Sequence, residues 1–177
     1  MTKQEIRRET KLRRKEFADS GREIPEAVSI WEMVESLPEF RSAGTVLLYM
    51  SIDGEVPTGG FIDKWRSTKK IVIPKVVGND LLLYEYDPDK LAEGYRGIAE
   101  PSEDAVRVGC PEVDLAIVPG VAFTRYGIRL GRGKGFYDRL LPQLTCPKIG
   151  ICFSYRILPH IPSDPWDVPL DKVISVE

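Results

Sequence analysis

Residues 114–141 read DLAIVPGVAFTRYGIRLGRGKGFYDRLL, and this stretch decides the fold class. It opens with a short apolar run that ends at Pro119 and Gly120, which is typical of a buried parallel strand. The letters FYDRLL at residues 136–141 predict the start of a helix. The order is therefore strand, long loop, helix. In open α/β sheets ligands bind outside the carboxyl ends of the strands, so we expect a binding site in this loop.

The loop alternates small and basic residues, with Gly131, Gly133 and Gly135 around Arg132 and Lys134. Glycine has no Cβ, so backbone N–H groups can approach a ligand closely and turn toward it. Converging N–H groups, mobile cations and the N-terminus of a helix together suit a phosphate group. The motif lacks the Ser or Thr of a P-loop, and its spacing differs from the G-x-G-x-x-G dinucleotide fingerprint. The alternative is a solvated surface loop.

Two acidic residues are candidate metal ligands. Asp138 follows the basic loop directly, and a carboxylate is favourable beside a phosphate when a divalent cation lies between them. Asp167 belongs to the Pro-rich segment 158–169, whose length is typical of a functional loop. The alternative for Asp167 is solvation of that loop, and the residues alone favour neither reading.

The rest of the chain alternates predicted helices and strands, which indicates an α/β fold. We predict helices at residues 3–19, 25–36 and 58–67, and strands at residues 45–50, 70–73 (closed by Pro74), 81–86, 115–118, 148–153 and 173–176. Residues 87–104 are expected to form a loop with at most a helical turn. The expected architecture is a single domain over residues 1–177, with a mostly parallel sheet flanked by helices in a Rossmann-like, three-layer arrangement.

Composition narrows the class of protein. The chain has 177 residues, 42% of them hydrophobic, and a net charge of −2, which suits one domain that buries roughly 70% of its unfolded surface. No run approaches the ~20 apolar residues of a membrane span, and the charged N-terminus lacks the apolar core of a signal peptide. The three cysteines show no C-x-x-C spacing, so we expect reduced thiols and no zinc site. His160 is the only histidine, which disfavours a histidine-based triad or metal cluster.

Two further positions carry charges that suit a ligand. Lys3 and Arg7 are four residues apart, so on a helix they share one face and can form a cationic patch. The interleaved glutamates favour a solvated helix face instead. Glu55 follows the predicted strand at residues 45–50 and can hydrogen-bond a polar ligand edge, although the residues alone modestly favour an ordinary loop acid.

These motifs together resemble the 5-formyltetrahydrofolate cyclo-ligases, also called 5,10-methenyltetrahydrofolate synthetases. The strongest match is PGVAFTRYGIRLGRGKGFYDRLL, which is similar to that family's P-G-x-x-F-D followed by G-x-R-L-G-x-G-x-G-[YF]-Y-D. Lys3 and Arg7 match the N-terminal K-x-x-x-R, and Glu55 lies in the segment Y-x-S-x-x-x-E-V. The runs IVIPKV, GIAEP and SDPWDVPLDKVI match as well, so the resemblance spans nearly the whole chain.

The chain departs from the family's pattern at two positions of the strongest match. Phe136 stands where the family usually has Tyr, which keeps the ring and loses the hydroxyl. Thr124 stands where the family usually has Asp, which removes a charge that would serve a metal or position the loop.

The resemblance implies an ATP-dependent ligase that cyclises 5-formyltetrahydrofolate to 5,10-methenyltetrahydrofolate and releases ADP and phosphate. It also implies Mg²⁺ as cofactor, with ATP as co-substrate. The ATP contacts that it implies are Lys3, Gln4, Glu5, Ile6, Arg7, Arg129, Gly131, Arg132, Gly133, Lys134, Gly135, Phe136 and Tyr137. The folate contacts are Met50, Glu55, Arg132, Gly133, Lys134, Gly135 and Phe136, the catalytic residues are Arg132, Lys134 and Tyr137, and the magnesium ligands are Asp138 and Asp167.

Two other classes of protein are alternatives. One is a nucleic-acid-associated module that uses the basic N-terminal helix and the GRGKG loop, although a net charge of −2 argues against a dominant phosphate-backbone binder. The other is a sugar-phosphate or acyl-CoA enzyme on a related α/β scaffold, since a fold alone does not fix a function. For the ligase we expect small-molecule substrates, no nucleic-acid or membrane partner, a cytoplasmic location, and a monomer or weak homo-oligomer.

Overall fold

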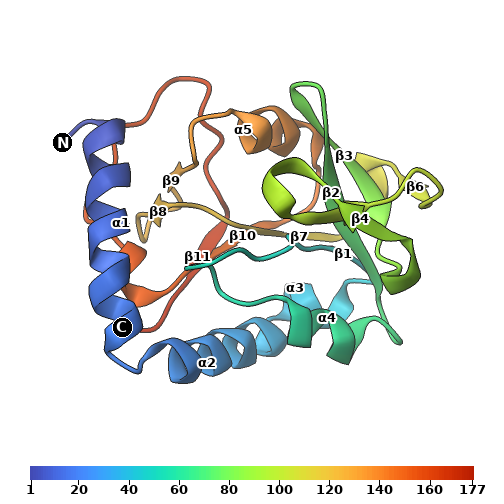
Figure 1. Ribbon diagram of the computed structural model, residues 1–177, viewed down its shortest axis with the longest axis horizontal. Helices are drawn as coiled ribbons and strands as arrows, with labels where there is room; N and C mark the ends of the chain where they lie inside the picture. The colour runs from blue at the N-terminus through green and yellow to red at the C-terminus, as the bar shows by residue number, and fades with distance from the viewer.

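The computed structural model describes residues 1–177, and a seven-stranded sheet runs through its middle (Figure 1). The strands of this sheet are β1 (Thr45–Leu47), β2 (Lys70–Val77), β3 (Asp80–Glu85), β6 (Arg107–Val108), β7 (Leu115–Val118), β10 (Lys148–Ile151) and β11 (Lys172–Ile174). Their order across the sheet is β11-β10-β7-β1-β2-β3-β6.

Five of these strands are parallel neighbours, in the spatial order β2-β1-β7-β10-β11. Numbered along the chain, this is the order 2-1-3-4-5 of a doubly wound fold, and the order reverses between β1 and β7. β3 and β6 extend the β2 side of the sheet in antiparallel orientation. The predicted α/β class with a mostly parallel sheet is therefore confirmed.

Helices cover both faces of the sheet and complete the three predicted layers (Figure 1). They are α1 (Lys3–Asp19), α2 (Glu23–Ser36), α3 (Pro38–Ser42), α4 (Gly59–Trp65) and α5 (Phe136–Leu140). Short 3₁₀ turns are η1 (Pro88–Lys90), η2 (Tyr95–Gly97), η3 (Cys110–Glu112), η4 (Leu141–Gln143) and η5 (Ser154–Arg156). In Figure 1, α2, α3 and α4 lie below the sheet, α5 lies above it, and α1 stands along the left edge.

The buried strands are apolar throughout because both faces of the sheet are covered. Val46 and Leu48 point to one core, where they join Ile30 of α2. Leu47 lies between them in sequence and points to the other core, where it joins Leu140 of α5. Each buried side chain of this size contributes about 1.5–3 kcal/mol to folding, so the two cores fix the sheet between its helices.

The first helix begins and ends where the sequence predicts, at Lys3 and Asp19. Its N-terminus is closed by a capping box, in which Thr2 accepts from the Glu5 N–H and the Glu5 carboxylate accepts from the Thr2 N–H. These bonds satisfy N–H groups that a helix end otherwise leaves without partners. None of the helices is both long enough and apolar enough to cross a membrane.

The prediction that Pro74 closes the second strand is wrong, since β2 continues to Val77. The Val72 carbonyl accepts from the Leu48 N–H at 2.8 Å, so this residue directs its backbone toward β1. Pro74, two residues further on, faces the same side, but β1 has already ended there. Its missing N–H therefore costs no ladder hydrogen bond, and the pairing with β3 goes on.

Two small hairpins replace segments that the sequence predicts as loop. β4 (Leu91–Glu93) pairs with β5 (Ala99–Pro101), and β8 (Ala122–Phe123) pairs with β9 (Arg129–Leu130). Strands of two or three residues are too short to show a periodic pattern, so only their tertiary surroundings stabilise them.

The predicted strand at residues 45–50 overshoots for a related reason. The ladder of β1 ends at Leu47, whereas Leu48 and Tyr49 remain buried beyond it. An apolar run indicates that side chains are buried, and it does not show that the backbone is paired. For the same reason β10 ends at Ile151, whereas the sequence predicts a strand that reaches residue 153.

Candidate active site

A pocket of about 180 Å³ lies at the carboxyl edge of the sheet, beside the point where the strand order reverses. Met50, which follows β1, and Pro119, which follows β7, both line it. The remaining walls come from the β2–β3 hairpin, the η2–β5 segment, the glycine-rich loop and α5. The pocket is thus where doubly wound folds bind their ligands, and the predicted position of the site in the loop after residue 118 agrees with it.

The glycine-rich loop bends back on itself before α5. Gly133 and Gly135 have φ angles of 96° and 71°, a region that residues with a Cβ rarely adopt. None of the backbone N–H groups from residue 131 to residue 135 donates to another protein group. Backbone donors normally find a partner, so this row of free N–H groups beside a pocket suits an anionic ligand.

The N-terminal helix is docked onto this loop. Ile6 is 1% exposed and packs with Ala122 and Leu130, next to the loop. Its neighbour Arg7 donates from Nε to the Gly131 carbonyl at 2.8 Å. The reading of Lys3 and Arg7 as a solvated helix face is therefore wrong, because tertiary packing turns this face inward.

Lys3 lies on the same face and joins the late Pro-rich segment. Its ammonium donates to Asp164 at 2.6 Å and to Asp167 at 2.8 Å. Burial disfavours the charged ammonium, but the two carboxylates outweigh burial and raise the pKa of Lys3. Burial likewise disfavours the charged carboxylate of Asp167, but hydrogen bonds from the Asp164 N–H and from Lys3 lower its pKa overall. Lys3 thus stays cationic and Asp167 anionic over the physiological range.

None of the five predicted ATP residues from Lys3 to Arg7 lines the pocket. Gln4 and Glu5 are exposed, and the Glu5 carboxylate is used in the helix cap. Ile6 is buried in the core described above. The ATP contact stays a prediction for all five positions. Arg7 reaches the glycine-rich loop, whereas Lys3 reaches the Pro-rich segment.

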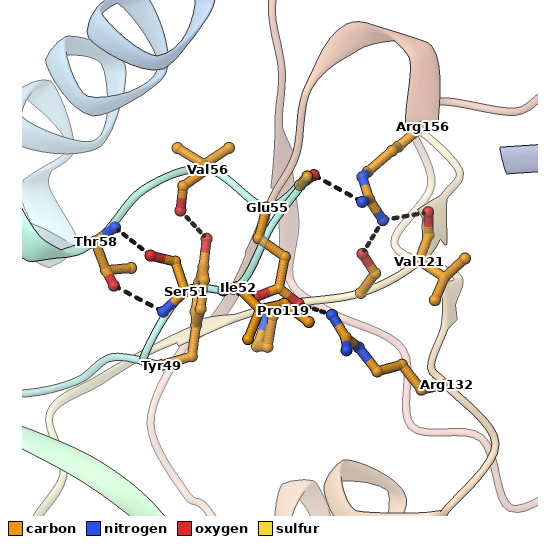
Figure 2. A network of polar contacts seen from close by, with 12 residues as sticks. Tyr49, Ser51, Ile52, Glu55, Val56, Thr58, Pro119, Val121, Arg132 and Arg156 are labelled. Atoms are coloured by element: carbon orange, nitrogen blue, oxygen red, sulfur yellow. Dashed lines mark hydrogen bonds and ion pairs between the residues drawn. The ribbon is translucent and has the colours of Figure 1, made fainter. Parts of the chain in front are cut away.

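Glu55 is held at the pocket wall by two hydrogen bonds (Figure 2). One carboxylate oxygen accepts from Arg132 Nη2 at 2.8 Å, and the other accepts from the Ile52 N–H at 3.1 Å. Its side chain is only 9% exposed, unlike that of an ordinary loop acid. The structure therefore brings together Glu55, Met50 and the basic loop, as the folate set requires.

Arg129 lines the pocket between the glycine-rich loop and α5. It is 5% exposed, and it donates to Asp138 at 3.0 Å and to the Pro119 carbonyl at 3.1 Å. Its guanidinium lies 5.3 Å from the centre of the Tyr137 ring. Burial lowers the pKa of Arg129, which nevertheless stays protonated because an arginine is never neutral in a protein.

Tyr137 keeps its proton at any physiological pH. Burial, and then the negative charge of Glu55, raise the pKa of its hydroxyl. A hydroxyl of this kind cannot act as a base at neutral pH, and its O–H stays available as a hydrogen-bond donor.

The two predicted metal ligands belong to two separate ion pairs, and only Asp138 lines the pocket. Asp138 is paired with Arg129, and Asp167 is paired with Lys3. The structure has no group of three or more His, Cys, Asp or Glu residues that would cage a metal ion. One or two carboxylates are nevertheless the usual protein share of a Mg²⁺ site, in which phosphate oxygens and waters complete the coordination. The donor chemistry therefore fits a magnesium ion carried by a nucleotide.

The sequence reasoning missed Arg156, which does not line the pocket but joins two of the loops that do. It is 6% exposed and donates to the carbonyls of Gly54 at 2.7 Å, Gly120 at 3.0 Å and Val121 at 2.9 Å (Figure 2). These carbonyls belong to the loops that follow β1 and β7, so one guanidinium ties both loops together at the pocket. The available signal was an arginine just after an apolar strand, in ICFSYRIL.

Thr124 takes a purely local role. It is 3% exposed, and its hydroxyl accepts from the Ile128 N–H at 3.1 Å across the tip of the β8–β9 hairpin. It does not line the pocket. The loss of the family's usual acid therefore leaves the hairpin turn closed by a hydroxyl, which accepts a backbone N–H as a carboxylate would.

The comparison with known proteins agrees with this geometry. The 5-formyltetrahydrofolate cyclo-ligase family model matches residues 1–176. A probable 5-formyltetrahydrofolate cyclo-ligase of Schizosaccharomyces pombe is 34% identical over 172 residues, covering 86% of this chain and 84% of that protein. The 5-formyltetrahydrofolate cyclo-ligase of Escherichia coli K12 is 35% identical over 148 residues, covering 78% and 81%.

A solved structure shares the whole fold. The 5,10-methenyltetrahydrofolate synthetase of Aquifex aeolicus superposes with a TM-score of 0.86 at 36% identity, over 99% of this chain and 90% of that one. A pocket at the reversal of a parallel sheet, lined by free N–H groups and cations, defines the class of an α/β enzyme for an anionic, phosphate-bearing ligand. Within that class, the chain belongs to the 5-formyltetrahydrofolate cyclo-ligase family.

Proposed function

We propose that this protein uses ATP to convert 5-formyltetrahydrofolate into 5,10-methenyltetrahydrofolate, with ADP and phosphate as the other products, and that residues 1–177 act as one catalytic domain. The observation that supports it best is the row of unpaired backbone N–H groups from residue 131 to residue 135, flanked by Arg7, Arg132 and Lys134. A triphosphate supplies the anionic oxygens that such a row of donors binds.

The chemistry explains why ATP is needed. The N5 formyl group is amide-like, and its oxygen is a poor leaving group. When that oxygen attacks the γ-phosphorus, ADP leaves and the formyl oxygen becomes a phosphate ester. The lone pair of N10 then attacks the activated carbon, the carbon–oxygen bond breaks with its electrons on phosphate, and N10 loses its proton to water.

Both nucleophiles of this reaction belong to the substrate, so the protein needs no nucleophile of its own. Phosphoryl transfer asks the protein mainly for positioning and for stabilisation of charge. Holding the formyl oxygen in line with the γ-phosphorus replaces a bimolecular encounter, which supplies on the order of 7–11 kcal/mol. The position of His160 agrees, since it is exposed and lies outside the pocket.

Each predicted residue then has a distinct task. Glu55 accepts from the donor edge of the pterin, and Met50 packs beside it. Arg132 and Lys134 bind the transferred phosphoryl group, and the protonated Tyr137 donates a hydrogen bond to an oxygen in the same pocket. Lys3, Arg7 and Arg129 hold the phosphate end of the site positive.

Asp138 and Asp167 would hold the magnesium ion. When bound, the ion would neutralise negative charge on the phosphates of the nucleotide. Asp138 is paired with Arg129, and hydrogen bonds from Lys3 and from the Asp164 N–H lower the pKa of Asp167 against the opposing effect of burial.

The Asp138→Asn variant tests this assignment. We expect its half-saturating Mg²⁺ concentration to rise about tenfold, because a neutral amide is a weaker ligand for a hard cation than a carboxylate. A magnesium titration at fixed ATP measures the shift. Asp19→Asn is the control, because Asp19 is an exposed acid outside the pocket. If the titration of Asp138→Asn overlays the wild-type curve, Asp138 does not belong to the metal site.

The proposed activity itself is tested by mixing the purified protein with 5-formyltetrahydrofolate and MgATP. We expect the methenyl chromophore to appear in proportion to the ADP formed, and to vanish when any one component is omitted. ATP hydrolysis that does not depend on the folate would contradict the proposal. Steeply salt-dependent RNA binding with no effect of ATP would favour the nucleic-acid alternative.

A further inference from the structure

Arg96 is a cation of the pocket that has no partner in the protein. It belongs to η2, between β4 and β5, and lines the pocket. The other two arginines of the pocket are engaged, Arg129 with Asp138 and Arg132 with Glu55. The guanidinium of Arg96 makes no hydrogen bond or ion pair, and lies only over the neighbouring Tyr95 ring, 5.5 Å from its centre.

The backbone of Arg96 is held in an unusual conformation. Its φ angle of 57° makes it the only residue other than glycine with a positive φ in this chain. Glycine adopts this region freely, whereas a residue with a Cβ is strained there. Strain of this kind persists where the surroundings impose it and is concentrated at ligand sites.

The turn that contains Arg96 is attached to the neighbouring strands. Glu100 is 8% exposed and accepts from the Val76 N–H at 3.3 Å, which ties β5 to β2. Gly94 lies directly against Glu100, since a Cβ at Gly94 would be 2.2 Å from a carboxylate oxygen. The turn therefore packs against the buried carboxylate of Glu100, which fixes the position of the turn beside the pocket.

The wall between Arg96 and the glycine-rich loop is aromatic and apolar. Tyr95 meets Phe136 edge to face, with their ring centres 5.8 Å apart, so η2 lies beside the start of α5. Val76, Leu81 and Ile98 line the same region. A ligand with a flat apolar group that ends in an anion would match this apolar wall and the guanidinium of Arg96 beside it.

We propose that Arg96 binds the glutamate carboxylate of the folate substrate. The inference rests on the proposed function, which places the pterin at Glu55 and the formyl group at the glycine-rich loop. The rest of such a substrate is an aromatic ring followed by glutamate. The ring packs against the aromatic wall, and the carboxylate meets the free guanidinium, whose two parallel donors match a carboxylate.

The test compares two ligands by equilibrium binding and by kinetics. One is 5-formyltetrahydrofolate, and the other carries the same head and ring but ends in a neutral amide in place of glutamate. The wild-type protein is expected to bind the first about 10- to 100-fold more tightly, as a charge-assisted pair would require. The Arg96→Gly variant is expected to bind both alike, with a KM for 5-formyltetrahydrofolate raised by that factor and an unchanged kcat.

Arg96→Gly also separates binding from folding. Glycine accepts a φ of 57° without strain, so the Tm of the variant should not fall below that of the wild type. Arg107→Ala is the matched control, because Arg107 is exposed, lies over the Tyr84 ring at the same 5.5 Å, and is outside the pocket. It should leave both affinities unchanged.

Two outcomes would overturn the inference. One is an unchanged affinity of Arg96→Gly for 5-formyltetrahydrofolate, and the other is an equal loss of affinity for both ligands. Binding that depends on the glutamate in a protein that makes no methenyl product would refute the proposed function and leave this inference standing. If the wild-type protein forms the methenyl product but shows no preference for the glutamate, this inference would be refuted and the proposed function would stand.

Discussion

Replacing Lys134 with alanine is expected to lower kcat by about 10²- to 10³-fold while the KM for 5-formyltetrahydrofolate changes little. Lys134 is exposed in the glycine-rich loop, lines the pocket, and its ammonium has no protein partner. A charge held free in this way stabilises the negative charge that develops as the γ-phosphoryl group moves. An interaction made mainly in the transition state lowers kcat when it is lost, and leaves ground-state binding intact.

Steady-state kinetics with each substrate varied in turn measure this separation. Lys11→Ala removes an equally exposed lysine of α1 outside the pocket, and should behave as the wild type. Lys134→Arg keeps the charge and should recover part of the rate. A Lys134→Ala enzyme with normal turnover at saturation and weakened folate binding would place Lys134 in ground-state recognition instead.

The Arg156→Met variant is expected to lose about 3 kcal/mol of stability or more, since each buried carbonyl left without its donor costs about 1–3 kcal/mol. Methionine fills a similar volume but leaves the carbonyls of Gly54, Gly120 and Val121 without their donor. For a chain of this length, that loss lowers Tm by about 10 °C. Activity should fall as well, since both loops that the guanidinium joins line the pocket.

Urea unfolding and calorimetry measure this loss. Arg66→Ala is the matched control, because Arg66 is 46% exposed and makes only a 3.4 Å surface pair with Asp63. Surface pairs contribute about 0–1 kcal/mol, so the control should unfold close to the wild type. If Arg156→Met were as stable as Arg66→Ala, the hydrogen bonds by which Arg156 joins the two loops would not contribute to the stability of the protein.

Much of the fold was predictable because it rests on patterns within the chain. The helix from Lys3 to Asp19 has no Gly or Pro, and the strand from Leu115 to Val118 is uniformly apolar, so both were located to the residue. Pro74 was misread because the cost of a proline depends on which neighbour its nitrogen faces. That information lies in the pairing of β1 with β2 and not in the local sequence.

The candidate site also has parts that local sequence predicts and parts that depend on tertiary contacts. The glycine-rich loop was found from spacing alone, since alternating glycines and cations suit a phosphate in any surroundings. For Lys3 and Arg7 the residues alone favoured a solvated helix face, because glutamates are interleaved with them, and only the family resemblance assigned them to ATP. The only local signal for Arg156 was its place just after an apolar strand, and Arg96 gave none. The carbonyls around Arg156 and most of the pocket walls near Arg96 lie far away in the sequence.

The sequence by itself determined the α/β class, the position of the glycine-rich loop and the family, because these depend on local periodicity and on short, contiguous motifs. Only the tertiary structure decided how α1 docks on that loop, how Arg156 joins the loops after β1 and β7, and which arginine is left free for a ligand. The physical reason is that hydrogen bonds and ion pairs act over a few ångströms in space, whereas these partners are separated by tens of residues along the chain.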